Sequence, residues 1–116
     1  MSKIDIRKSR VKNTKRAGVL EFLVYRHKSG YIGVCLTLNI VEEGKNAQKL
    51  MESLKEAARG HVMLVIKRKL NDDLLNRPAP DKYWEIYWDA LERLELHSSV
   101  RSPYYTQQIP LRELAT

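Results

Sequence analysis

The chain has 116 residues, 43% hydrophobic and 30% charged, which fits one globular domain with a single core. Its one cysteine, Cys35, cannot form an internal disulfide, so nothing requires an oxidising compartment. The longest apolar run, Val62–Ile66, is far shorter than the roughly 18 residues of a membrane span, and the N-terminus lacks a signal-peptide pattern. We therefore expect a cytoplasmic protein that does not enter a membrane.

The positive charge is concentrated at the N-terminus. The formal net charge is +7, from 21 basic and 14 acidic residues. Residues 1–17 contain one acidic residue, Asp5, and seven basic ones: Lys3, Arg7, Lys8, Arg10, Lys12, Lys15 and Arg16. Such a basic flexible arm is typical of contact with nucleic acid or an acidic partner, but a solvated tail has the same composition, and both readings stay open. Ile4 and Ile6 alternate, as at the start of a short strand.

Residues 19–45 predict three antiparallel strands. Leu20, Phe22 and Val24 alternate on one face of a strand over residues 19–25. The segment 27–30 ends in Gly30, which predicts a turn. We therefore expect residues 31–36 to form the second strand of a hairpin. Residues 38–41 continue into a third strand that residues 43–45 close.

A long amphipathic helix follows. Asn46 is a good N-cap residue, although Lys49 leaves the capping box incomplete. The apolar positions recur at helical spacing: Ala47, Leu50, Met51, Leu54, Ala57, Ala58, Val62 and Val65. Gly60 lies inside this helix and costs about 1 kcal/mol relative to Ala. Basic residues 67–69 suit the negative end of the helix dipole.

The C-terminal part predicts a second amphipathic helix over residues 82–96, capped by Asp81. Residues 104–109 predict a strand that Pro110 stops. We divide the chain into an arm (1–17), an α+β domain (18–80) and a C-terminal helix and tail (81–116). The last part either packs on the same domain or forms an oligomer interface.

No pattern of catalytic, metal-binding or cofactor-binding residues is found. His27, His61 and His97 lie far apart without metal-ligand spacing, and the five glycines are isolated, so no phosphate-binding loop is present. Cys35 lies within an apolar strand, where a cysteine usually packs as a small hydrophobe. Glu21 is the only acidic residue within a clearly predicted strand, whereas a metal-dependent nuclease needs several acids in one cleft. We therefore expect a protein that is not an enzyme and has no cofactor.

Four aromatic residues gather on the second helix: Tyr83, Trp84, Tyr87 and Trp88. The two tryptophans are one helical turn apart and share a face. They either pack this helix onto its own sheet or anchor a partner or oligomer interface, where aromatic residues are enriched.

The order of strands and helix over residues 19–70 resembles the HicB family, the antitoxin half of HicA–HicB toxin–antitoxin modules. The matching residues are Gly30-Tyr31, the segment 36–41, and residues 43–46 leading into the helix that begins Ala47-Gln48-Lys49-Leu50. The proline-containing segment 77–80 is also similar. Thr37 and Asn39 replace the proline and glycine usual in that family, and a helix stands where a final strand is common.

The resemblance implies a partial ribonuclease-H-like fold: an antiparallel sheet of three or four strands with the long helix on one face. It also implies a non-catalytic module that binds a protein partner, such as a small ribonuclease toxin, and self-associates into a homo-oligomer. The basic arm opposes binding of a basic toxin, because like charges repel. The alternative is a nucleic-acid-binding protein that uses the arm to contact DNA or RNA.

Overall fold

The computed structural model describes residues 12–96 and 104–115. Its elements, in chain order, are β1 (Val19–His27), β2 (Gly30–Cys35), β3 (Ile40–Gly44), α1 (Ala47–Lys67), the 3-10 helix η2 (Asp72–Leu75), α2 (Asp81–Leu96), β4 (Tyr104–Pro110) and α3 (Leu111–Leu114). No helix in the described part of the chain has both the length and the apolar character needed to cross a bilayer.

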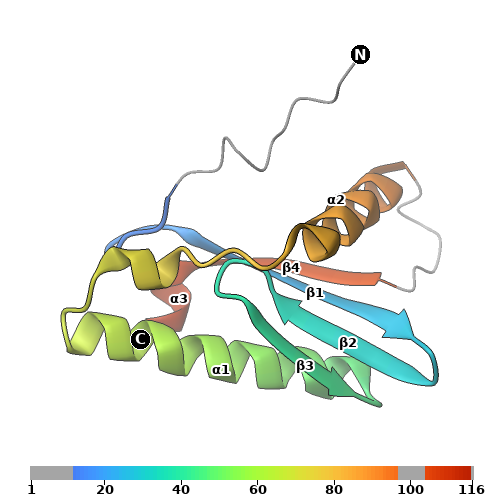
Figure 1. The fold of residues 1–116 in the computed structure, drawn as a ribbon, viewed down its shortest axis with the longest axis horizontal. Helices are drawn as coiled ribbons and strands as arrows, with labels where there is room; N and C mark the ends of the chain where they lie inside the picture. Colours follow the sequence, from blue (N-terminus) through green and yellow to red (C-terminus); the bar gives the residue numbers. More distant parts are fainter. Residues whose placement is uncertain (1–11, 97–103, 116) are drawn as a thin grey trace.

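The four strands form one antiparallel sheet in the order β3-β2-β1-β4 (Figure 1). His27 pairs with Gly30 across the tight β1–β2 hairpin, where Lys28 has a φ of 56°. A second turn places Asn39 at a φ of 55° before β3. Asparagine tolerates this left-handed conformation better than most residues. The third strand therefore begins at Ile40 rather than at Leu38.

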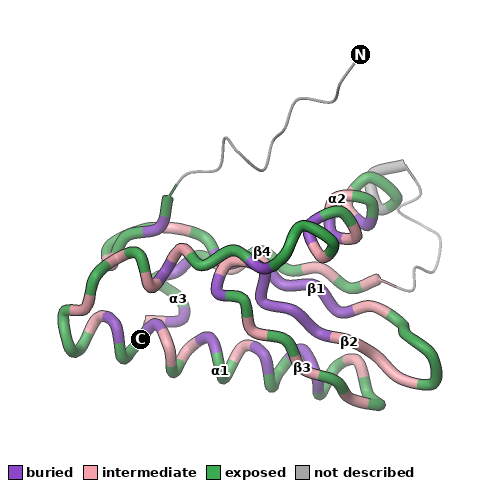
Figure 2. The backbone as a smooth tube through the Cα atoms, in the orientation of Figure 1, coloured by how far each residue is buried: buried purple, intermediate pink, exposed green. Residues whose placement is uncertain are grey.

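A long helix and a shorter one cover opposite faces of the sheet, because successive strand residues point to opposite sides. Leu20 and Phe22 of β1 are fully buried on the α1 side. Leu23 of β1 and Val34 of β2 are fully buried on the α2 side. Figures 1 and 2 show the sheet between the two helices, with the buried residues at both contacts. The α+β class with a long helix on one sheet face and a C-terminal amphipathic helix is confirmed.

The helix α1 begins and packs as its sequence predicts. The Asn46 side chain accepts a hydrogen bond from the Lys49 backbone N–H at 2.9 Å. The glycine at position 33 of β2 allows α1 to approach closely, since a Cβ there would lie only 2.6 Å from Leu54 Cδ1. Gly60, in contrast, has no atom within 4 Å of the place where its Cβ would stand.

The prediction of a flexible arm over residues 1–17 differs from the structure at its last residues. Asn13 is only 3% exposed and is hydrogen-bonded to Val19, Leu75 and Asn76. The strand predicted from Ile4 and Ile6, and the position of His97, lie outside the described residues.

Candidate functional site

Asn13 attaches the start of the described chain to the segment that contains η2. Its backbone N–H donates to Asn76 Oδ1 at 2.7 Å, and its side-chain Nδ2 donates to the Leu75 carbonyl at 3.1 Å. Its Oδ1 accepts from the Val19 N–H at 2.9 Å. Gly18 follows with a φ of 152°, and a Cβ there would lie 2.0 Å from Asn13 Oδ1. The pair of a turn-forming asparagine and a glycine five residues later is a sequence signal for this anchor.

The anchor places Lys15 beside η2, the segment that follows α1. Lys15 Nζ lies 2.5 Å from Asp72 Oδ1 of η2. Lys12 and Arg16 are exposed nearby in the chain. The other predicted arm residues, Lys3, Arg7, Lys8 and Arg10, lie outside the described residues. They join the domain through residue 12, so the chain of the arm enters at this end of the molecule (Figure 1).

The loop between α1 and η2 adds a second basic segment. Lys67 ends α1, Arg68 is its C-cap, and Lys69 follows with a φ of 53°. All three side chains are exposed. Backbone hydrogen bonds from Arg68 and Leu70 to the last turn of α1 hold this loop in place. From the sequence alone, the basic residues 67–69 are accounted for by the negative end of the helix dipole. The structure adds that the loop leads directly into the segment that contacts Asn13 and Lys15.

We call residues 12–18 together with residues 67–77 the basic end. In the sequence, residues 1–18 and 67–77 hold eleven basic and three acidic residues, a formal charge of +8. All other residues hold ten basic and eleven acidic residues, a charge of −1, which together give the +7 of the whole chain. The net positive charge therefore belongs to two segments that the tertiary structure joins. Positive charge concentrated in part of a protein attracts polyanions more strongly than the same charge spread evenly.

The aromatic residues of α2 are mostly used inside the domain. Trp84 and Tyr87 are each 1% exposed and pack on Leu23 and Val34 of the sheet. Their rings meet edge to face with centroids 5.8 Å apart, and the Tyr87 hydroxyl accepts a hydrogen bond from Gln108 Nε2 at 2.8 Å. An interface role is excluded for these two side chains in the folded chain, because they are already buried.

Tyr83 and Trp88 are half-buried at the margin of the same cluster. The Trp88 ring stacks on Trp84, and Lys82 Nζ lies 5.0 Å from the centroid of the Tyr83 ring. Of the four residues predicted for an interface, these two alone keep accessible surface for one.

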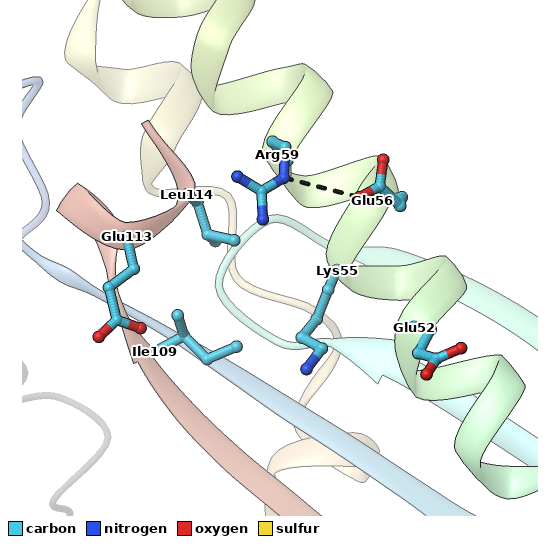
Figure 3. Close-up of a pocket in the computed structure, with 7 residues that line it drawn as sticks. All are labelled: Glu52, Lys55, Glu56, Arg59, Ile109, Glu113 and Leu114. Atoms are coloured by element: carbon cyan, nitrogen blue, oxygen red, sulfur yellow. Dashed lines mark ion pairs between the residues drawn. The ribbon is translucent and has the colours of Figure 1, made fainter. Parts of the chain in front are cut away.

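A groove lies between α1 and the C-terminal segment, as Figure 3 shows. It encloses about 480 Å³. Its lining residues are Glu52, Lys55, Glu56, Arg59, Ile109, Glu113 and Leu114. Arg59 Nε lies 3.6 Å from Glu56 Oε1, and Lys55 Nζ donates to Gln107 Oε1 at 3.3 Å. With three acidic and two basic residues, the groove lacks the one-sided charge of the basic end.

Cys35 is a core residue, as predicted. Its side chain is fully buried on the α1 side of the sheet, and burial raises the pKa of its thiol to about 12. A thiol held in its neutral form is a poor nucleophile. His61 Nε2 donates to the Leu74 carbonyl at 2.5 Å and so helps to hold η2 on α1. Within the described residues, no three His, Cys, Asp or Glu side chains are grouped as metal ligands.

No protein-family model, curated protein or solved structure matches this chain. The resemblance of residues 19–70 to the HicB family therefore stays a prediction.

Proposed function

We propose that this protein is a non-catalytic binding module and that its basic end, continued by the N-terminal arm, contacts the phosphate backbone of a nucleic acid. The observation that supports the proposal is the separation of charge: +8 in the arm and basic end, and −1 in the rest of the chain. A protein that neutralises phosphates with Lys and Arg releases condensed counterions, so its affinity falls steeply with salt. Backbone contacts of this kind carry no sequence preference.

Because Asn13 is hydrogen-bonded to the domain, a test of the arm should leave this residue in place. Deleting residues 1–17 would also remove Asn13 and its hydrogen bonds to Asn76 and Leu75, and so would destabilise the domain. Deleting residues 1–11 removes four basic residues and leaves the anchor in place. The second deletion separates loss of binding from loss of folding.

The experiment measures binding of the full chain to single-stranded and duplex oligonucleotides over a series of salt concentrations. Lys67→Gln, Arg68→Gln and Lys69→Gln together should weaken binding to every sequence. They should also reduce the salt slope on duplex DNA by about 2 to 3, since each neutralised phosphate contributes about 0.9. The matched control replaces Lys45, Lys49 and Lys82 by Gln. These residues are exposed outside the basic end, and the control lowers the net charge by the same three units.

The proposal fails if the two triple variants weaken binding equally, because net charge and not its placement would then decide affinity. It also fails if the wild-type chain binds neither oligonucleotide at low salt. Deletion of residues 1–11 should lower the affinity further. An unchanged affinity would remove the arm from the interface and leave only the basic end.

The HicB resemblance supports a second candidate function, binding of a basic protein partner. The observation that favours it is an acidic stripe on the outer side of α2, where Asp81, Glu85, Asp89 and Glu92 are exposed. Asp89 is paired with Arg93 at 2.9 Å. Because the positive charge lies elsewhere, a basic partner would meet this stripe without strong repulsion from the basic end.

A pull-down from native lysate, with and without nuclease, distinguishes the two candidates. Protein binding predicts that a small basic protein survives nuclease treatment and is lost when Asp81 and Glu85 are replaced by Lys. Nucleic-acid binding predicts that nuclease removes the captured material, and that the Lys variants retain it. A basic protein captured equally by the wild type and the Lys variants would contradict the assignment of the acidic stripe.

A further inference from the structure

The two outer strands of the sheet, β3 and β4, differ in how open their edges are. The order β3-β2-β1-β4 leaves one side of each strand without a neighbour among the described residues. Such an edge presents free N–H and C=O groups to any further strand. Natural proteins usually protect edges with charged residues, prolines or short length.

The register identifies which backbone groups of β4 point toward β1 and which point away from it. The Leu111 N–H donates to the Gly18 carbonyl at 2.9 Å, which makes these two residues a hydrogen-bonded pair in the β1–β4 ladder. Hydrogen-bonded and non-hydrogen-bonded pairs alternate in an antiparallel ladder. The N–H and C=O groups of Tyr105, Gln107 and Ile109 therefore point toward β1. Those of Thr106 and Gln108 point away from β1, toward the outer edge of the sheet.

The length and charge of β3 protect its edge, whereas the length and composition of β4 do not. β3 has five residues, two of them the charged Glu42 and Glu43. β4 has seven residues, Tyr-Tyr-Thr-Gln-Gln-Ile-Pro, without a charge and without a proline before its last position. Tyr105 is 46% exposed on the α1 side of this strand. The protein thus has one charged, short edge and one longer, neutral edge rich in hydrogen-bonding side chains.

We propose that β4 pairs with β4 of a second copy of this chain, antiparallel about a two-fold axis at Thr106. In this register Thr106 faces Thr106 of the other copy, and this pair is hydrogen-bonded. Gln108 stands opposite Tyr104 of the other copy. Between them Tyr105 faces Gln107, a non-hydrogen-bonded pair in which side chains approach most closely. The exposed Tyr105 ring is thereby covered on both copies.

The second copy is the occupant for three reasons. The strand is self-complementary in the register just described, since the outward N–H of Thr106 meets the outward C=O of Thr106 in the other copy. The repelling charge of the arm and basic end lies in other segments, while β4 is neutral. Finally, pairing of the two β4 strands gives an eight-stranded sheet whose outer strands are the charged, short β3 edges. The assembly is therefore closed and does not continue into a fibre. This inference is independent of the proposed function.

Sedimentation velocity of the full chain over a concentration series tests the dimer. The wild type should dimerise, and Thr106→Pro should raise the dimer dissociation constant at least about tenfold, because it removes the two symmetric hydrogen bonds at the axis. The proline removes no hydrogen bond within the domain, since the Thr106 N–H points outward, and proline is tolerated on edge strands. The control Thr106→Val keeps the N–H and should dimerise as the wild type does. Circular dichroism of each variant verifies folding.

A charge pair tests the register. Tyr105→Glu with Gln107→Glu puts like charges opposite each other twice in the dimer and should abolish it. Tyr105→Lys with Gln107→Glu puts opposite charges there and should retain it. A monomeric wild type, or a dimer that persists in folded Thr106→Pro, would overturn the proposal. Equal dimerisation of the two charge variants would overturn the pairing centred on Thr106.

Discussion

Asn13 and Asn76 hydrogen-bond to each other twice, although 63 residues separate them in the sequence. The Asn13 N–H donates to the Asn76 side-chain oxygen at 2.7 Å, and the Asn76 side-chain nitrogen donates to the Asn13 carbonyl at 2.8 Å. This pair joins the base of the N-terminal arm to the segment after α1. It therefore joins the two halves of the basic end.

Asn13→Ala should destabilise the domain by about 2 kcal/mol, measured by urea unfolding. The substitution removes the side-chain hydrogen bonds to Leu75 and Val19 and leaves partly buried backbone groups without them. Thr14→Ala is the control, because the Thr14 hydroxyl bonds only within its exposed turn. An equal loss of stability in both variants would contradict the anchor.

Gly60→Ala should stabilise the protein by about 1 kcal/mol. Glycine costs this much relative to Ala within a helix, and the new methyl group would meet no atom within 4 Å. Gly33→Ala is the same substitution at a glycine that has no room for a methyl group, and it should have the opposite effect. Its methyl group would stand 2.6 Å from Leu54 Cδ1 and should destabilise by about 1–3 kcal/mol. Thermal unfolding of the two variants should move the melting temperature in opposite directions.

Trp84→Ala should destabilise the domain by about 3–5 kcal/mol, because it removes a large side chain that is 1% exposed. The result would show the side chain in its own core rather than at an interface. Tyr83→Ala, at a half-buried position, should cost much less. Urea unfolding provides the comparison. Near-equal losses would contradict the packing of α2 on the sheet.

The Cys35 thiol should react with Ellman's reagent near pH 8 far more slowly in the folded chain than in urea. Burial raises its pKa to about 12, whereas the unfolded thiol has a pKa of about 8.5. Because the folded pKa is the higher one, this thiol contributes stability below pH of about 8.5 that is lost as pH rises toward 12. Cys35→Ala should therefore lose less stability than the wild type over this range. Equal reaction rates in the two states would contradict the burial.

Much of the fold followed from local patterns. The alternation of Leu20, Phe22 and Val24 predicted β1, and the three-and-four spacing after Asn46 predicted α1 with its cap. These patterns work because strand and helix periods place apolar side chains on one face. The sequence predicts that the third strand starts at Leu38, but it starts at Ile40, since Leu38 is apolar and buried although it lies in a turn. Burial alone does not distinguish a strand from a turn.

The candidate sites were predicted less completely. The basic residues of the arm were recognised by composition, but their connection with residues 67–69 depends on the contacts of Asn13, which join segments about 60 residues apart. The aromatic stripe of α2 was recognised too. Which of its members are buried depends on how α2 lies on the sheet. Periodicity identifies an apolar face but not what covers it.

The sequence by itself determined the class of the fold, the long helix, the core cysteine and the excess of positive charge, because composition and periodicity act along the chain. Among the described residues, the tertiary structure decided which basic segments are joined, which aromatic residues are enclosed, and which strand edge has no neighbouring strand. Those features arise from contacts between residues far apart in sequence, where hydrogen bonding and packing select one arrangement among many that the local patterns allow.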